Sequence, residues 1–94
     1  MRKIERATAF RRDFRRESKG RRSVTLYDDL AAIIAVLASD APLDPSVRDH
    51  ALSGDWQGYR ECHVKPDLLL IYRKTDDDLL RLARLGSHSE LFKK

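Results

Sequence analysis

Three short runs of apolar and aromatic residues in the second half of the chain limit its fold most strongly. The runs are 57–64, 68–74 and 78–85, and each is long enough for one β-strand. Polar links separate them, Lys-Pro-Asp at 65–67 and Thr-Asp-Asp at 75–77, and such links turn antiparallel strands around. The pattern predicts a meander of three adjacent antiparallel strands.

An amphipathic helix is expected near the N-terminus. Phe10 and Phe14 stand one helical turn apart with arginines between them, so the two rings would share one face and leave a basic face opposite. Thr8 is a suitable N-cap, and Gly20 provides an end. The pattern predicts a helix over residues 8–19 that lays two aromatic rings on a core.

A second helix is predicted over residues 25–39. Its apolar residues recur at i, i+4, i+7 and i+11, the spacing of one buried stripe. These residues are Leu26, Leu30, Ile33 and Leu37. Thr25 followed by Asp28 resembles a capping box with Asp in place of the usual Glu. The link between the helices is short, so they should pack as a hairpin.

The remaining segments complete a two-layer α+β pattern. Residues 2–6 form a short first strand at most, and residues 42–54 form a loop. The tail, residues 87–94, should dock Leu91 and Phe92 onto the rest of the domain. Ninety-four residues suffice for one core. The predicted architecture is a single α+β domain in which an N-terminal strand and a helix hairpin pack on an antiparallel β-meander.

Composition narrows the class of protein. One cysteine, Cys62, excludes an internal disulfide, and its place in a predicted strand favours an inert buried thiol. The N-terminus lacks the apolar core of a signal peptide, and no run is long enough to cross a bilayer. A cytoplasmic protein without a membrane partner is expected.

Positive charge is concentrated at the start of the chain. Residues 1–22 hold ten Lys and Arg against three acids, so this segment carries +7 and the rest of the chain −3. Such a patch attracts polyanions through phosphate contacts and counterion release. The segment indicates nucleic acid or an acidic partner, and the alternative is a solvated helix face.

All three histidines fall in the second half of the chain. His50 lies in the predicted loop, His63 in the first strand of the meander and His88 after its last strand. Histidine is well suited to move protons near neutral pH, so this concentration indicates a site. On the third strand, the period of two separates Arg81 from Arg84, and only one of them shares a face with His63 unless a bulge intervenes.

Four features of this half of the chain occur together. They are a histidine at 50, the turn and strand Gly-x-Trp-x-Gly-Tyr-Arg at 54–60, a second histidine with Pro-Asp behind it, and Gly-x-His at 86–88. In this combination the chain resembles the YafQ-type toxins of the RelE/ParE superfamily. The resemblance implies a RelE-like fold, and the order of predicted elements agrees with it.

The resemblance also implies a function. It is that of the toxin in a type II toxin–antitoxin system, a ribosome-dependent endoribonuclease that cleaves mRNA and inhibits translation. The implied partners are the ribosome with its mRNA and a cognate antitoxin that wraps the toxin. No metal and no cofactor are implied.

Site residues follow from the same resemblance. The catalytic positions are His50, His63, Asp67 and His88. The substrate-binding positions are Arg84, Phe92 and Lys65. The residues expected to contact the backbone of ribosomal RNA are Arg11, Arg12, Arg15, Arg16, Arg21 and Arg22. The chain departs from the family at Leu68, where a tryptophan is common, so a stacking role for an indole is lost or moved.

The residue types alone also suit RNA cleavage without a metal. That reaction needs a base for the 2′-hydroxyl, a cation or donor for the phosphorane and an acid for the departing 5′-oxygen. His88 is the expected acid, His63 or Asp67 the base, and Arg84 the phosphate ligand, with His50 in support. Phe92 is positioned in the sequence to stack on a base.

Other interpretations of these residues remain open. The three histidines suit an open zinc site that activates water, although their spacing lacks the pairing of common zinc motifs. His63 could donate to Asp67, and Arg84 could pair with Glu61. The chain could also be a non-catalytic nucleic-acid or partner-binding module of the same fold, or a gyrase-directed ParE-like toxin. The three histidines argue against the gyrase-directed branch.

Overall fold

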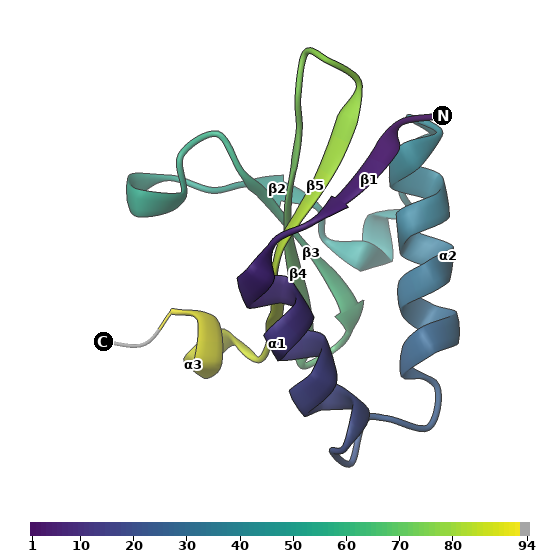
Figure 1. Ribbon diagram of the computed structural model, residues 1–94, viewed down its shortest axis with the longest axis vertical. Coiled ribbons are helices and arrows are strands. Elements are labelled where there is room, and N and C mark those ends of the chain that lie inside the picture. Colours follow the sequence, from purple (N-terminus) through teal and green to yellow (C-terminus); the bar gives the residue numbers. More distant parts are fainter. Residues whose placement is uncertain (93–94) are drawn as a thin grey trace.

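This computed structural model describes residues 1–92 of the chain. A sheet of five strands forms the centre of the molecule (Figure 1). The strands are β1 (Lys3–Arg6), β2 (His50–Ala51), β3 (Arg60–Lys65), β4 (Leu68–Lys74) and β5 (Leu79–Gly86). Their spatial order is β1-β5-β4-β3-β2. The predicted antiparallel meander is confirmed as β3-β4-β5, and β1 joins the edge of β5 in parallel.

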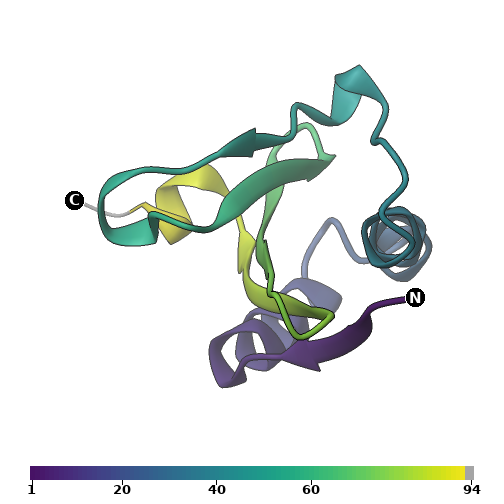
Figure 2. The same cartoon turned by 90° about the horizontal axis from the view of Figure 1, so that it is seen from above.

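Helices cover the two faces of the sheet unequally. The long helices α1 (Thr8–Ser18) and α2 (Leu26–Ala38) lie on one side, and the short α3 (His88–Leu91) lies on the other side, beside the β2–β3 hairpin (Figures 1 and 2). Two 3₁₀ turns, η1 (Pro45–Val47) and η2 (Gly54–Trp56), lie before and after β2. The predicted two-layer α+β fold is confirmed.

The core divides into two clusters separated by β4. Under the long helices, Leu68, Leu70 and Tyr72 pack with the helix leucines and the ring of Phe10. On the opposite face, Leu69 and Ile71 pack with a smaller group of side chains from α3 and the segment before β3. That group comprises Leu91, Phe92, Leu52, Trp56 and Tyr59. β4 is apolar on both faces because both are covered.

The predicted α1 and α2 are confirmed within one or two residues, but their caps differ from the prediction. Thr8 is the first helical residue, and the N-cap of α1 is Ala7, which makes no side-chain bond. Thr25 is the N-cap of α2, yet its hydroxyl donates to Asp29 instead of capping the backbone. Asp28 therefore does not complete a capping box.

The largest differences from the sequence prediction lie between 45 and 60. β3 begins at Arg60, three residues later than expected, because η2 and Gly58, at φ 91°, turn the chain before the strand. β2 was not predicted: its two residues are too few to show a period of two. The predicted docking of Leu91 is confirmed at 7% exposure, while 93–94 of the predicted tail lie outside the described residues.

A bulge interrupts the pairing of β4 with β5. Ile71 pairs with Arg84, but the next residue, Tyr72, pairs with Leu82, so Ala83 is the extra residue. Because of this insertion, Arg81 and Arg84 both lie in register with residues of β4 on the α3 face, rather than on opposite faces. The sequence predicted only one of the two arginines on the face of His63 unless a bulge intervened, and this is such a bulge.

Cys62 is fully buried in the core of β3, as expected. Burial, together with the negative charges of Asp49 and Glu61, raises the pKa of its thiol to about 12. The thiol is therefore protonated and unreactive in the folded protein.

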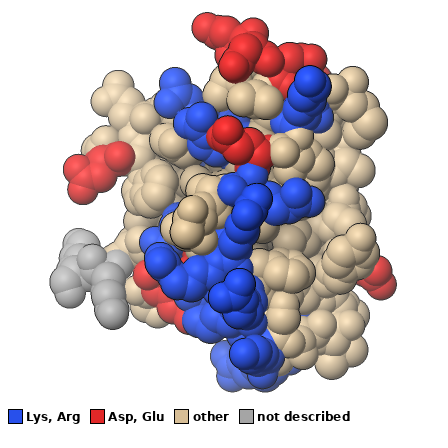
Figure 3. All heavy atoms as spheres, in the orientation of Figure 1, with Lys and Arg blue, Asp and Glu red and all other residues tan. Residues whose placement is uncertain are grey.

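Lys and Arg side chains gather in a band over α1 and the loop that follows it (Figure 3). Acidic side chains lie mainly around this band rather than within it. Over residues 1–92, no helix combines the length and apolarity that crossing a membrane would require.

Candidate active site

The strand register places His63 two strands away from Gly86, the glycine that precedes His88 by two residues. His63 on β3 lies opposite Leu69 on β4, and Leu69 lies opposite Gly86 on β5. Adjacent strands are about 4.8 Å apart, so His63 and Gly86 stand roughly 10 Å apart across the sheet. His88 follows two residues later, at the first position of α3.

The ring of His63 is held at the end of β3. Its Nδ1 lies 3.2 Å from the carbonyl oxygen of Pro66. A carbonyl only accepts hydrogen bonds, so Nδ1 carries the proton and donates. In the neutral ring Nε2 is then the proton acceptor, and no hydrogen bond to Nε2 forms within residues 1–92.

His50 on β2 is paired with an acid that sequence reasoning did not select. Its Nε2 lies 3.3 Å from Oε1 of Glu61, and its Nδ1 lies 2.7 Å from the carbonyl oxygen of Arg48. Glu61 is 5% exposed, and its Oε2 has no hydrogen-bond partner among the described residues. His50 thus shares its site with a buried carboxylate.

α3 carries His88 and is stabilised at its start by a capping box. The hydroxyl of Ser87 accepts from the backbone N–H of Glu90, and Glu90 Oε1 accepts from the N–H of Ser87 at 2.7 Å. His88 is exposed, and its ring centroid lies 5.0 Å from that of Phe92. The structure therefore places the predicted acid and the predicted stacking residue side by side.

Asp67, in the turn between β3 and β4, is joined to the end of α1 by arginines. Its Oδ2 accepts from Arg22 at 3.1 Å and lies 3.7 Å from Arg21. Arg22 also pairs with the buried carboxylate of Glu17 at 2.8 Å. Asp67 is not bonded to His63, so that sequence-based contact is wrong.

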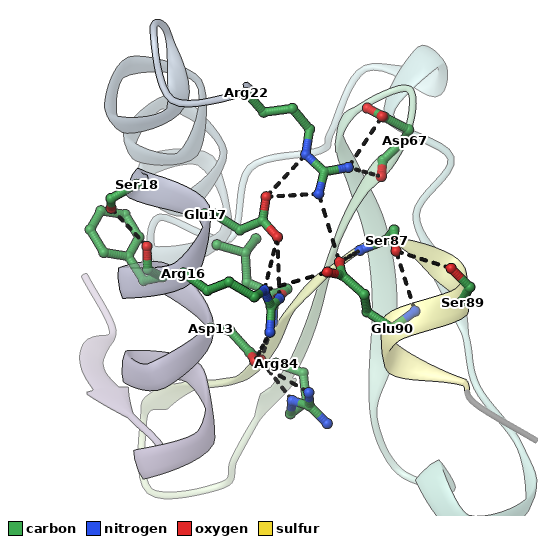
Figure 4. A network of polar contacts seen from close by, with 12 residues as sticks. Asp13, Arg16, Glu17, Ser18, Arg22, Asp67, Arg84, Ser87, Ser89 and Glu90 are labelled. Atoms are coloured by element: carbon green, nitrogen blue, oxygen red, sulfur yellow. Dashed lines mark hydrogen bonds and ion pairs between the residues drawn. The ribbon is translucent and has the colours of Figure 1, made fainter. Parts of the chain in front are cut away.

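Arg84 pairs with Asp13 of α1 and not with Glu61 as the sequence alternative held. Its Nε donates to Oδ2 of Asp13 at 2.6 Å, and its Nη2 donates to Oδ1 at 3.2 Å. This two-pronged pair joins β5 to α1 (Figure 4). Asp13 is completely buried.

One chain of ion pairs connects these side chains (Figure 4). Arg16 bonds to Asp13 at 3.0 Å and lies 3.4 Å from Glu90, the residue that caps α3. Arg22 lies 3.7 Å from Glu90 as well and reaches Asp67. The network therefore connects the Asp67 turn, the Arg84 strand and the start of α3, where His88 stands.

Gly86 lies in close contact with side chains of this network. A Cβ atom there would lie 2.9 Å from Nη2 of Arg16, 3.1 Å from Glu90 Oε1 and 3.2 Å from a methyl of Leu91. A larger residue would force the side-chain ends of Arg16, Glu90 and Leu91 to shift. The glycine of the Gly-x-His motif thus leaves room for these side chains.

Lys65 lies apart from that network. Its ammonium binds Asp29 of α2 at 2.7 Å and also donates to the hydroxyl of Thr25. It shares with His63 the lining of a hollow between the end of β3, α2 and η1. Lys65 therefore ties β3 to α2 beside His63.

The six arginines expected on the RNA backbone fall into two groups. Arg11, Arg12, Arg15 and Arg21 are exposed at the surface. Arg16 and Arg22 also bind the buried acids Asp13 and Glu17, with side chains 41% and 16% exposed respectively. These two arginines hold α1 against the site, and their contact with RNA stays a prediction.

The three histidines do not form a metal cluster. Within residues 1–92 there is no group of three or more His, Cys, Asp or Glu side chains arranged to hold an ion. His50 pairs with Glu61, while His63 bonds to the Pro66 carbonyl. The donor set thus does not match the open three-histidine zinc site considered from the sequence.

Sequence reasoning missed Asp13, Glu17 and Glu61, although part of the signal was present. Asp13 and Glu17 stand three and seven residues after Phe10, which places them on the buried face of α1. Acids on the apolar side of a helix need cationic partners. Glu61 is buried on β3 between its partners His50 of β2 and Ile71 of β4, and β2 is too short to be predicted from a local pattern.

An apolar groove was also missed. It runs between α1 and α2 and is lined by Phe14, Tyr27, Leu30 and Ile34, with Arg11 and Arg15 at its rim. Tyr27 is 73% exposed. No stripe of apolar residues in the sequence marks this groove, because each of the two helices contributes only a few positions to it.

Known proteins place the chain in a family. The sequence profile of the family described as "Bacterial toxin of type II toxin-antitoxin system, YafQ" matches residues 2–93. The mRNA interferase toxin YafQ of Escherichia coli strain BL21-DE3 is 36% identical over 91 residues, covering 97% of this chain and 96% of that protein. For the K12 protein of the same name, identity is 53% over 51 residues, or 54% of each chain.

Solved structures agree with these sequence matches. The Escherichia coli DinJ-YafQ complex contains a chain with a TM-score of 0.83 and 36% identity, and the match covers 98% of this chain and 99% of that one. A metal-bound toxin from Helicobacter pylori has a TM-score of 0.87 and 41% identity, with 98% and 100% coverage. The chain therefore belongs to the YafQ family of bacterial toxins of type II toxin–antitoxin systems.

Proposed function

We propose that this toxin domain is an mRNA interferase, an endoribonuclease that cleaves mRNA on the ribosome by metal-independent acid–base catalysis and so inhibits translation. Relatives named mRNA interferase toxin YafQ support the class of reaction. The observation that carries the proposal is the grouping on the α3 side of the sheet: His63 lies in register with Gly86, and His88 and Arg84 flank that glycine.

His63 is the better supported of the two candidate bases. Its Nδ1–H is committed to the Pro66 carbonyl, so Nε2 is the atom that would accept the proton of the 2′-hydroxyl. Asp67, by contrast, has its Oδ2 occupied by Arg22 and lies in a network of ion pairs. We assign the base function to His63 and a positioning function to Asp67.

His88 is assigned as the acid that protonates the departing 5′-oxygen. It is exposed at the start of α3, where substrate can reach it, and Phe92 packs beside its ring. Phe92 offers a face for a nucleotide base, an interaction worth about 1 to 3 kcal/mol in single-stranded RNA binding. His50, supported by Glu61, assists at the far edge of the same face.

Arg84 is assigned to the scissile phosphate. Arginine presents five N–H donors in a fixed fork, and only two of them are used on Asp13, so three remain for phosphate oxygens. Removing one such stabilising donor costs about 10²- to 10³-fold in rate in well-studied enzymes. Lys65 is bound to Asp29 and has no part in this assignment.

The ribosome is the proposed platform for cleavage. Arg11, Arg12 and Arg15 are exposed on α1 and form no ion pair within residues 1–92, so their charge is available to ribosomal RNA. Figure 3 shows the band of Lys and Arg to which α1 belongs. Contacts of this kind bind through counterion release and weaken as salt rises.

A cognate antitoxin is the proposed second partner, in keeping with the DinJ-YafQ complex of Escherichia coli. The groove between α1 and α2 is the surface we assign to it. The groove is apolar inside and basic at its rim, which suits an amphipathic segment with acidic flanks. Such a segment would also cover Arg11 and Arg15 and so compete with the ribosome.

A reconstituted reaction tests the proposed activity. Purified toxin is incubated with a defined mRNA, with or without ribosomes programmed by it, in buffer containing or lacking a chelator. Cleavage is expected only with ribosomes, and the chelator should leave it unchanged once ribosome integrity is controlled for. Cleavage lost on chelation and restored by a transition metal would overturn the metal-independent mechanism, and no cleavage under any condition would overturn the enzyme itself.

A further inference from the structure

Asp13 occupies an unusual position for a carboxylate. It is fully buried where α1 meets the end of β5 and receives four hydrogen bonds. Its Oδ2 accepts from Arg84 Nε at 2.6 Å and from the backbone N–H of Leu85 at 3.0 Å. Its Oδ1 accepts from Arg84 Nη2 at 3.2 Å and from Arg16 Nη1 at 3.0 Å.

This arrangement fixes the guanidinium of Arg84 more tightly than an exposed ion pair would. Nε and Nη2 form one edge of the guanidinium fork, and both of their bonds go to the same carboxylate, which sets the plane and rotation of the group. The carboxylate is in turn fixed by the Leu85 N–H of β5. Within residues 1–92 the opposite edge of the guanidinium forms no hydrogen bond, which leaves it for another ligand.

The same carboxylate is connected to the start of α3 only through intervening side chains. Arg16, bound to Asp13, donates from Nη2 to the Leu85 carbonyl at 2.8 Å and lies 3.4 Å from Glu90. Glu90 caps the N–H of Ser87, which precedes His88. Asp13 is thus bonded to Arg84 directly and reaches the backbone before His88 through Arg16 and Glu90.

We propose that Asp13 is a positioning residue for cleavage, which aims the free edge of the Arg84 guanidinium at the scissile phosphate. The inference rests on the proposed function, and specifically on Arg84 as the phosphate ligand. A buried Asp–Arg pair with a merely structural role would not need the arginine to keep an unbonded edge. Here the arginine side chain is 23% exposed on the face that carries His63.

A double-mutant cycle tests the inference. The variants are Asp13→Asn, Arg84→Ala and the double substitution, assayed for kcat and KM in the ribosome reaction, with folding followed by urea unfolding. We expect Arg84→Ala to lower kcat about 10²-fold and Asp13→Asn to lower it at least tenfold, with KM nearly unchanged. The double variant should be no slower than Arg84→Ala, because Asp13 acts through Arg84.

Two further variants keep the test decisive. Glu5→Gln removes another acid that pairs with an arginine of β5, Arg81, and is the matched control that should keep kcat. Arg84→Lys leaves Asp13 unsubstituted and retains the positive charge but not the guanidinium fork, so its kcat should fall. This variant can be assayed even if Asp13→Asn does not fold.

The outcomes separate this inference from the proposed function. Arg84→Ala could be slow, while adding Asp13→Asn to it lowers kcat again by the factor that Asp13→Asn causes alone. In that case Asp13 does not act through Arg84, and the proposed function stands. Full kcat in Arg84→Lys would also overturn the positioning role. Absence of cleavage by the unsubstituted protein would overturn the proposed function and the inference together.

Discussion

His50 and Glu61 form a pair in which the ring contacts an acceptor with each nitrogen. Nδ1 lies 2.7 Å from the Arg48 carbonyl and Nε2 lies 3.3 Å from Oε1 of Glu61. A carbonyl accepts and does not donate, so Nδ1 must carry a proton. A hydrogen bond at Nε2 then requires one more proton, located on the ring or on Glu61.

The first prediction concerns the tautomer of His50. Long-range ¹H–¹⁵N correlation spectra of the folded protein should show a protonated Nδ1 at every pH at which the domain is native. In Glu61→Gln the same Nδ1–H should persist, because the Arg48 carbonyl is unchanged. A neutral ring protonated at Nε2 alone would contradict the described geometry.

The second prediction concerns acid stability. Burial would raise the pKa of Asp13, but the bonds from Arg84 and Leu85 and the charges of Arg84 and Arg16 outweigh it and lower the pKa. A carboxyl whose pKa is lower when folded stabilises the protein above the unfolded value of about 3.9 and loses this contribution as the pH falls through the folded value.

Urea unfolding between pH 7 and about pH 3 checks this. Asp13→Asn should cost about 3 kcal/mol or more in the free energy of unfolding at neutral pH, as expected for breaking a buried ion pair. The difference from the unsubstituted protein should shrink as the pH falls below about 4. A difference that stays constant would show that the charge of Asp13 does not contribute.

The third prediction tests the groove between α1 and α2. Tyr27→Asp should weaken antitoxin binding by about 2 kcal/mol, or ~30-fold in Kd, because it places an acid against an acidic segment. Val24→Asp is the control, since Val24 is 91% exposed but does not line the groove. Equal effects of the two variants in titration calorimetry would locate the antitoxin elsewhere.

The fourth prediction concerns the basic face of α1. Replacing Arg11, Arg12 and Arg15 together by alanine should weaken ribosome binding and make its dependence on log salt shallower by about 2. Stability should change little, because these side chains are exposed. Lys3→Ala, an exposed cation on β1, is the control. A binding constant and salt slope equal to those of the unsubstituted protein would remove α1 from the ribosome contact.

The sequence predicted those helices and strands in which apolar residues extend over enough positions to form a recognisable pattern. The stripe of α2 and the run 68–74 of β4 both match the structure. The period of two failed on β5 because one inserted residue, Ala83, reverses the faces of all that follow it, and an insertion in pairing leaves no mark in one strand's own residues.

For the site, the residue types were predictable, and their connections were not. The family pattern selected Arg84 and His50, but the acids that hold them, Asp13 and Glu61, come from α1 and from the neighbouring strand β3. Those contacts span about 70 residues of sequence in the case of Asp13 and Arg84. Pairing over such a distance depends on how α1 docks, which charge counting cannot supply. The ion pairs of Arg16 and Arg22 with buried acids were not predicted for that reason.

The central claim is cleavage of mRNA with His88 as the acid. The most direct measurement induces the unsubstituted toxin or His88→Ala in matched cells and maps the 5′ ends of mRNA. New ends inside open reading frames are expected only with the unsubstituted protein, together with growth arrest. Equal toxicity of both proteins without such ends would contradict the account.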